Sequence, residues 1–150
     1  MRTLHFAASS VVAAVLVTSP LACHHAMPPD QAIAELKNPD PNERQRAADS
    51  LRTDDGVPAN AVPALLEAVK TEQTPNVRGA ELITLGRSGA PDAKPVIDDA
   101  VQSAKDPDMR RWASRALKYW MIATKALPAD YAFPEGWPYG QPGFPPRLPQ

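Results

Sequence analysis

The residues with the most distinctive chemistry stand together near the start of the chain. Cys23 is followed directly by His24 and His25, and a thiolate beside two imidazoles is a set of ligands that zinc accepts. Cys23 is also the chain's only cysteine, which excludes an intramolecular disulfide and a zinc site built on paired cysteines. Two adjacent histidines in a tether are a poor chelate. We therefore expect no metal site here.

Acidic pairs are the next candidates for chemistry, because two converging carboxylates can act as a general acid and a general base. The pairs Asp54–Asp55 and Asp98–Asp99 are adjacent in sequence, and adjacent residues on a helix point in different directions. No histidine lies in the central region, so a Ser/His/Asp or Cys/His system is not available. The sequence predicts no catalytic and no cofactor-binding residue, and the chain is not expected to be an enzyme.

The net charge of −1 is the third constraint. Proteins that bind nucleic acid or anionic membrane surfaces through their charge carry a basic excess or a basic patch. We therefore expect no nucleic-acid ligand, and the sequence indicates no small-molecule substrate.

Residues 1–22 are typical of an export signal. A short basic start, "MRTLH", precedes the apolar run "FAASSVVAAVLV", which is too short to span a bilayer as a helix. The end of this segment resembles a bacterial lipoprotein signal, in which a small residue precedes a cysteine that becomes lipidated. Ala22 and Cys23 match that pattern, whereas Pro20 departs from it because leucine is usual there. The alternative is ordinary cleavage that leaves a free cysteine.

Lipidation of Cys23 implies a location. Two or more acyl chains give stable membrane attachment, so the resemblance implies a protein of the cell envelope joined to its anchor by a tether at residues 23–28. In lipoproteins of this kind, a residue other than aspartate after the cysteine, here His24, favours the outer membrane, facing the periplasm.

The central region, residues 29–125, is expected to be helical throughout. Its apolar residues recur at helical spacing and alternating β-branched runs are few. Turn signals rich in proline, glycine, asparagine and aspartate divide it. The expected helices span residues 29–37, 42–53, 60–72, 75–87, 91–104 and 107–125.

These helices belong to a repeating unit. The segments "PNERQRAADSL" (41–51), "PNVRGAELITL" (75–85) and "PDMRRWASRAL" (107–117) share proline first, asparagine or aspartate second, arginine fourth and leucine eleventh. Their starts are 34 and 32 residues apart. A helix precedes each segment, so the sequence predicts three stacked helix pairs, an all-α short solenoid.

The pattern resembles HEAT repeats, in particular the short bacterial kind related to those of phycobiliprotein lyases. The middle unit matches in "AVPALLEAV" (61–69) and "VRGAELITLG" (77–86), and the third in "KDPDMRRWASRAL" (105–117), whereas the first is degenerate. The resemblance implies protein binding or scaffolding through the concave groove formed by the second helices. A 34-residue period is also typical of tetratricopeptide repeats, but their Trp-Leu-Gly and Tyr positions are absent.

The repeats differ in ways that predict their places in the stack. In the third unit one helix face is apolar, through Met109, Trp112, Ala113, Ala116, Leu117 and Trp120. The middle unit adds Leu82 and Ile83 outside the corresponding face, as expected of a unit covered on both sides. The first unit has Glu43 and Arg46 at positions that are apolar elsewhere, as expected of a solvent-facing cap. Gly86 is expected to stop the middle helix.

Arginine recurs once per unit, at Arg44, Arg78 and Arg110. In a stacked solenoid these side chains would form a column. One interpretation is a structural ladder in which each guanidinium binds carbonyls or carboxylates of the turns, with Asp40 and Asp106 as candidate partners. The other is an exposed basic rail for an acidic protein.

The irregular tail, residues 126–150, contains 7 prolines and 5 aromatic residues, which excludes a continuous helix. Three interpretations stay open. The tail packs on the last unit through Tyr131, Phe133 and Trp137, or it is a spacer. Alternatively it is a docking peptide, since "PGFPPR" (142–147) fits a polyproline ligand. The possible docking residues are Trp137, Tyr139, Phe144 and Arg147.

The sequence thus predicts a membrane-tethered interaction or scaffold module that binds a protein through its groove, its tail or both. The alternatives are an accessory subunit of an envelope enzyme and a purely structural envelope component. A deep pocket lined by two or more ionisable groups would overturn the expectation of a binding module in favour of the enzyme-related alternative.

Overall fold

The computed structural model describes residues 27–130. Cys23, His24, His25 and the tail beyond Asp130 lie outside this range. Within it the chain forms helices and, in place of strands, a single antiparallel bridge between Thr53 and Gly56. The elements are α1 (Pro29–Glu35), α2 (Pro41–Ser50), the 3₁₀ helix η1 (Ala59–Ala61), α3 (Val62–Thr71), α4 (Pro75–Ser88), α5 (Ala93–Ser103) and α6 (Pro107–Ala123).

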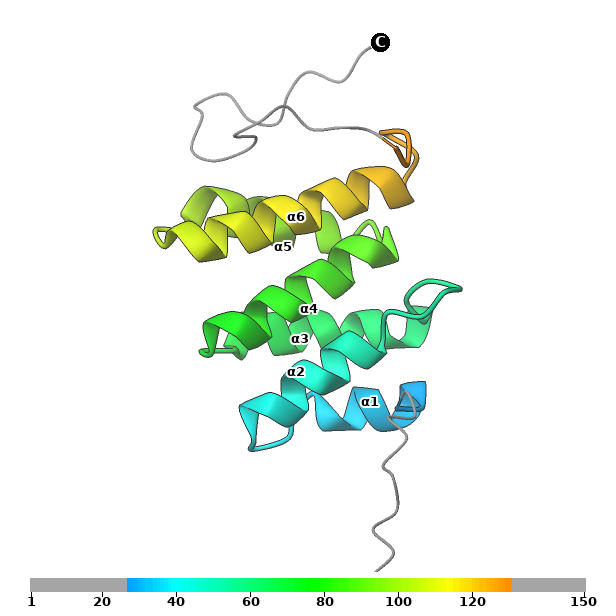
Figure 1. Cartoon of the computed structure of the whole chain (residues 1–150), viewed down its shortest axis with the longest axis vertical. Coiled ribbons are helices and arrows are strands. Elements are labelled where there is room, and N and C mark those ends of the chain that lie inside the picture. The colour runs from blue at the N-terminus through cyan, green and yellow to red at the C-terminus, as the bar shows by residue number, and fades with distance from the viewer. Residues whose placement is uncertain (1–26, 131–150) are drawn as a thin grey trace, which may run out of the picture.

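The six α-helices form three pairs that stack in chain order (Figure 1). The second helices, α2, α4 and α6, lie along one side of the stack, and α1, α3 and α5 lie behind them. Met27 begins at one end of the stack and Asp130 ends at the other. The predicted all-α architecture of three helix pairs is confirmed.

The recurring Asp-Pro or Thr-Pro at the start of each second helix has a local cause. Proline at the first position suits a helix because it has no N–H to leave unpaired. The preceding aspartate then accepts a hydrogen bond from the helix start: Asp40 from the N–H of Asn42 at 2.9 Å and Asp106 from that of Met109 at 2.9 Å. Both aspartates therefore cap helices.

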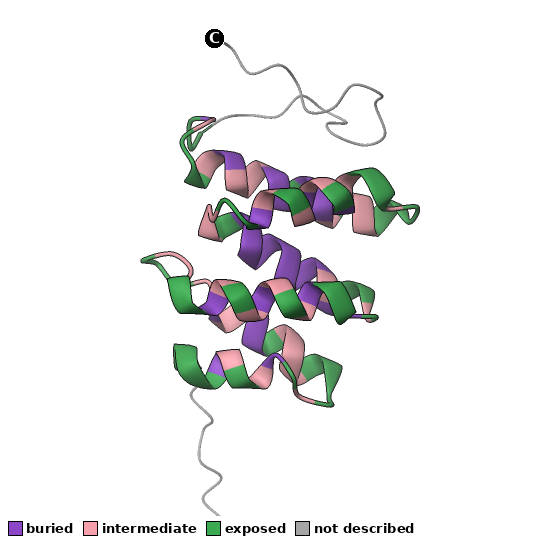
Figure 2. Ribbon diagram, turned by 180° about the vertical axis from the view of Figure 1, so that it is seen from behind, coloured by how far each residue is buried: buried purple, intermediate pink, exposed green. Residues whose placement is uncertain are grey.

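Helix α4 occupies the centre of the stack (Figure 2) and packs against α2, α3, α5 and α6. Residues 79–86 are all buried, and Leu82 and Ile83 are among them. The prediction that the middle unit is covered on both sides is confirmed. The first unit is exposed as expected of a cap, because Arg46 faces solvent and pairs with Glu43.

The prediction that Gly86 ends the middle helix is wrong. The helix continues to Ser88, and Gly89 adopts the left-handed conformation with φ 63°. Gly86 instead lies against α6, where a Cβ atom would overlap the backbone carbonyl of Ala116. Gly79, two turns earlier, lies under the Trp112 ring. A Cβ atom on Gly79 would be only 2.7 Å from Cγ of Trp112. The two glycines allow α4 and α6 to approach closely.

Candidate functional site

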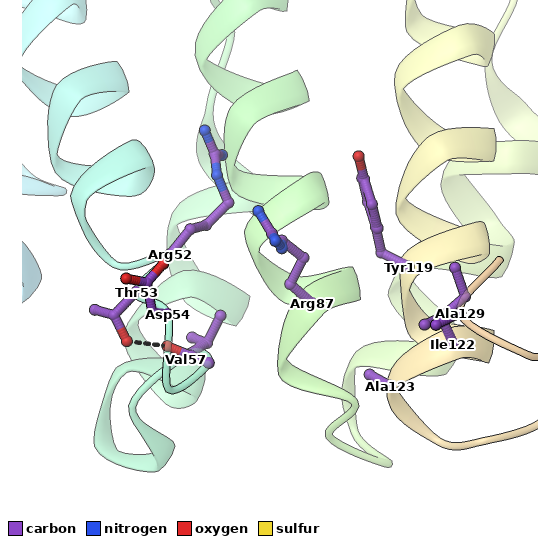
Figure 3. A pocket seen from close by; sticks show the side chains of 10 residues that line it. Arg52, Thr53, Asp54, Val57, Arg87, Tyr119, Ile122, Ala123 and Ala129 are labelled. Carbon is purple, nitrogen blue, oxygen red and sulfur yellow. Dashed lines mark hydrogen bonds between the residues drawn. The ribbon is translucent and has the colours of Figure 1, made fainter.

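The residues at one position of the repeat line the same pocket in all three units. This position is the twelfth residue after the first proline of each second helix. This position is Thr53 in the first unit, Arg87 in the second and Tyr119 in the third. All three line a pocket of about 330 Å³ that crosses the stack at the C-terminal ends of α2, α4 and α6 (Figure 3). We call this pocket the groove site. It belongs to the second helices, which were expected to form the binding groove.

Arg52 forms a fixed wall of the groove site. Its Nη1 donates to the hydroxyl of Thr84 at 3.1 Å, and its Nη2 pairs with Asp49. The Thr84 hydroxyl in turn donates to a backbone carbonyl, with the oxygens of Ala48 and Ala80 each at 2.9 Å. These bonds join α2 to α4, so the Arg52 guanidinium has a structural task.

Arg87 is the more available cation of the groove site. It is exposed at the end of α4, and Figure 3 places it between Arg52 and Tyr119. Its guanidinium carbon lies 5.4 Å from the centre of the Tyr119 ring, within the range of a cation–π contact. This contact holds the positive charge of Arg87 over the aromatic face of Tyr119, in the lining of the groove site.

The remaining lining of the groove site mixes polar and apolar groups. The loop after α2 is tightened by the Thr53 hydroxyl, which donates to the carbonyl of Gly56 at 2.7 Å, and Asp54 stands at the rim. Val57 and Ile122 supply apolar surface. The site offers an arginine, an aromatic ring and apolar contacts, the combination that dominates binding energy at protein interfaces.

A second pocket, of about 450 Å³, opens at the opposite edge of the stack. It is bounded by the turn between α1 and α2, by α3, and by the turn between α3 and α4, with Glu81 of α4 among its lining residues. We call it the turn pocket. Its lining includes several ionisable side chains: Lys37, Arg44, Glu67, Glu72 and Glu81.

Arg44 and Glu72 form a two-point ion pair in the turn pocket. Nε of Arg44 lies 2.6 Å from Oε2 of Glu72, and Nη2 lies 3.1 Å from Oε1. Nη1 donates to the carbonyls of Asn38 at 2.8 Å and Pro39 at 3.1 Å. Glu72 also accepts from the N–H of Thr74 at 2.7 Å. The hydrogen bonds from Arg44 lower the pKa of Glu72 to about 2 despite its burial.

Glu81 differs from Arg44 and Glu72, the paired residues of the turn pocket, in having no bonding partner in the described chain. The residue is fully buried, and neither carboxylate oxygen has a hydrogen-bond partner within residues 27–130. Burial, reinforced by the charge of Glu72, raises the pKa of Glu81 to about 8, although the charges of Arg44 and Arg78 act in the opposite direction. A buried carboxyl without a partner is costly.

The predicted arginine column is uneven. Arg44 binds turn carbonyls, as a structural ladder requires, and its acidic partner is Glu72 while Asp40 caps α2. Arg78 is half-buried on α4, and its Nε is buried without a hydrogen-bond partner in the described part of the chain. Arg110 is half-buried on α6. Among contacts within residues 27–130, only Arg44 has the full set of bonds that the ladder interpretation assumes.

The other predicted site residues belong to the anchor and the tail. Cys23 of the anchor and Trp137, Tyr139, Phe144 and Arg147 of the tail lie outside the described residues. Between residues 27 and 130 no group of His, Cys, Asp and Glu side chains is arranged to hold a metal ion. No helix in that same range is long and apolar enough to cross a membrane.

Sequence reasoning overlooked Arg87, Tyr119 and Glu81. Arg87 and Tyr119 share a repeat position, so following every position of the aligned units, polar ones included, would have found them. Glu81 occupies the position of Ala47 and Ala113 in the other units. A glutamate at a repeat position that holds alanine in the other two units could have identified this residue from the sequence.

Comparisons with known proteins give one match. A family model described as HEAT repeats matches residues 29–118. No curated protein and no solved structure matches the chain.

Proposed function

The chain belongs to the HEAT-repeat family, and from that premise we propose that it is a protein-interaction module of the bacterial cell envelope, anchored through lipid on Cys23. HEAT repeats generally mediate protein–protein interaction or scaffolding. The module has a binding role and catalyses no reaction itself. Its partner is a protein, which it engages through the groove site, with the tail as a second possible contact.

The observation that carries this proposal is the groove site, because it draws one residue from the same position of every unit. Arg87 and Tyr119 form its exposed centre, and Arg52 is held in place beside them. A ligand seated there touches all three units at once. Repeat proteins characteristically bind along such a continuous surface.

The charge of the neighbouring surface indicates the chemistry of the partner. Helix α6 carries four basic residues and one acidic residue, Asp108, and Arg87 adds a further positive charge at the end of α4. Opposite charges at an interface set orientation and association rate. We therefore propose a partner that presents an acidic segment with at least one apolar or aromatic side chain.

Site-specific crosslinking tests this role. A photo-crosslinking residue in place of Asp54, at the rim of the groove site, should capture a discrete protein in intact cells. The same residue in place of Lys70, exposed on α3, is the matched control and should not. Arg87→Glu should abolish the capture at Asp54 without changing the thermal midpoint, because Arg87 is exposed. Equal capture from both positions, or capture unaffected by Arg87→Glu, contradicts the proposal.

The anchor is tested separately. The wild-type chain should incorporate labelled palmitate and fractionate with membranes, and Cys23→Ser should lose both properties. The localisation proposed is the outer membrane, facing the periplasm, on the strength of the lipoprotein-like "LAC" and the following His24. A Cys23→Ser chain that stays with membranes, while the wild type takes up no label, removes the anchor from the proposal.

The turn pocket favours a second candidate, an accessory subunit of an envelope enzyme, since it is lined by several ionisable groups. Arg44 and Glu72, however, bind each other and the backbone. Glu81 is then a single carboxyl without an acid–base partner, which is better suited to binding than to proton transfer. The groove site therefore supports the first candidate better.

A further inference from the structure

Glu81 is a buried carboxyl that the fold does not require. The other two units hold alanine, Ala47 and Ala113, at its position, and both are fully buried. Alanine would fill the same place without the cost of a carboxyl that has no hydrogen-bond partner. Unsatisfied buried polar groups are rare in folded proteins, and each calls for an explanation. The location of Glu81 in the lining of the turn pocket supplies one.

The walls of the turn pocket already bind one cation. The Arg44 guanidinium is held by two backbone carbonyls of the α1–α2 turn and by both oxygens of Glu72. The C-terminal end of α3 also borders the pocket, and the C-terminus of a helix favours positive charge. The acceptors of this wall are therefore arranged for N–H donors. Glu81 is the carboxylate among them that still lacks a donor.

The opening is suited to a narrow chain. Ala64, Ala68 and Thr71, which lie on one face of α3, line it with small side chains. The pocket's 450 Å³ exceeds the volume of an unbranched alkylamine and falls within the range of pockets that hold small ligands. Glu67 and Lys37 stand at the exposed rim with opposite charges, so the rim itself has no strong preference of sign.

We propose that the turn pocket is a binding site for a primary alkylammonium group, which enters between α3 and the α1–α2 turn and pairs with the Glu81 carboxylate. The proposal does not depend on the groove site, which lies at the other edge of the stack. The alkylammonium belongs either to a free amine or to a lysine side chain of another protein. Both sources offer the same three N–H donors on a flexible stem.

Binding must be coupled to a proton. The charged groups that act on Glu81 are Arg44 from α2, Glu72 from the end of α3, and Arg78 from its own helix. With its pKa at about 8, Glu81 is mostly protonated at neutral pH and must release its proton to pair with a cation. The apparent affinity for an ammonium group therefore rises about tenfold per pH unit up to pH 8 and levels off above it.

Carbon-13 NMR of the full chain, labelled on glutamate, measures this directly. The probes are 1,5-diaminopentane and a short peptide with one lysine, each beside a matched compound without the amino group. We expect the Glu81 carboxyl resonance to shift on addition of an amine, and its pKa to fall by at least about one unit at saturation. The matched compounds should leave it unchanged.

Two variants make the test specific. Glu81→Gln removes the ionisable carboxyl from the lining of the turn pocket and should lower amine affinity at pH 8 at least about tenfold, with the pH dependence lost. Glu67→Gln removes an exposed rim charge and should change the affinity less than about threefold. Circular dichroism checks that both variants are folded, which the alanines of the sister units lead us to expect for position 81.

Each outcome of the amine titrations either supports or overturns the proposed ammonium site. Tighter binding of the lysine peptide assigns the pocket to a partner's side chain, and tighter binding of the diamine assigns it to a free amine. Both outcomes support an ammonium site. The proposal is overturned if neither amine moves the Glu81 resonance, or if the Glu81→Gln chain binds as tightly as the wild type. Neither of these results would contradict the function proposed for the groove site.

Discussion

Two buried carboxyls on adjoining elements have pKa values that are shifted in opposite directions. Glu72 is bound by the Arg44 guanidinium, and its pKa falls to about 2. Glu81 has no hydrogen-bond donor in the described chain, and its pKa rises to about 8. Relative to an ordinary value of 4.5, Glu72 stabilises the fold above pH 4.5, and this contribution is lost as the pH falls toward 2. The contribution of Glu81 is fully present below pH 4.5 and is lost as the pH rises through 8.

The first prediction concerns Glu81→Gln. In the wild type, the free energy of unfolding should decrease between pH 4.5 and 8 through this residue, because the unfolded chain loses the proton more readily than the folded one. The variant should lack this decrease and be more stable than the wild type by about 1–3 kcal/mol at pH 8. Urea unfolding at pH 5 and pH 8 measures it. Parallel pH profiles for the two proteins would falsify the buried-charge account of Glu81.

The second prediction concerns Arg44→Ala. Its guanidinium joins the first unit to Glu72 of the second, whose side chain is only 4% exposed. Removing it leaves a buried carboxylate without its partner, which should cost about 2–4 kcal/mol of unfolding free energy at pH 7. Arg46→Ala is the control, because Arg46 pairs with Glu43 at the surface and should cost less than about 1 kcal/mol. Equal losses would contradict the role given to Arg44.

At the scale of elements, the contact between α4 and α6 depends on residues without side chains. Gly86 faces the backbone of Ala116, which cannot move without displacing α6. Gly79 faces the side chain of Trp112, which is only half-buried and is not part of the main chain. An added methyl group therefore meets main-chain atoms at Gly86 and a side chain at Gly79.

The third prediction follows from this difference. Gly86→Ala should destabilise the chain by about 3 kcal/mol or more, since the added methyl group overlaps main-chain atoms. Gly79→Ala should cost less, about 1 kcal/mol, because the half-buried Trp112 side chain can shift about its Cα–Cβ bond and alanine is the better helix former. Thermal and urea unfolding of both variants measure the order. A Gly79 variant less stable than the Gly86 variant would show that the two helices yield more easily than the Trp112 ring.

The sequence was informative about elements because periodic apolar residues and Asp-Pro starts are local signals. The six helices and their pairing follow from residues such as Pro41, Pro75 and Pro107. Gly86 was misinterpreted because a glycine near the end of a helix is normally a stop, and only the approach of α6 explains its place. Glu81 and Arg87 were missed because the pattern was followed at apolar positions, whereas their roles arise from contacts between units.

At the scale of the whole molecule, residues 131–150 of the tail lie outside the described range. The described chain already closes the last helix: the N–H of Leu127 donates to the carbonyl of Met121 at 3.0 Å, and Leu127 is buried. A truncation that tests the tail must therefore retain residues up to 130.

The fourth prediction is that removal of residues 131–150 lowers the thermal midpoint by about 4 °C or more. We expect Tyr131, Phe133 and Trp137 to cover the last unit, and even 1 kcal/mol of lost contact gives a shift of that size in a domain of this length. The triple variant with alanine at these three positions should reproduce the loss. An unchanged midpoint, with loss of the protein captured at the groove site, would instead assign the tail to docking.

The stack also keeps the two ends of the described chain apart, with Met27 at one end and Asp130 at the other (Figure 1). If Cys23 is held at a bilayer, the three units separate the end of the described chain from the membrane-bound tether. Inserting or deleting a unit would change how far the chain reaches from the membrane. The number of repeats thus sets a distance as well as an area of contact.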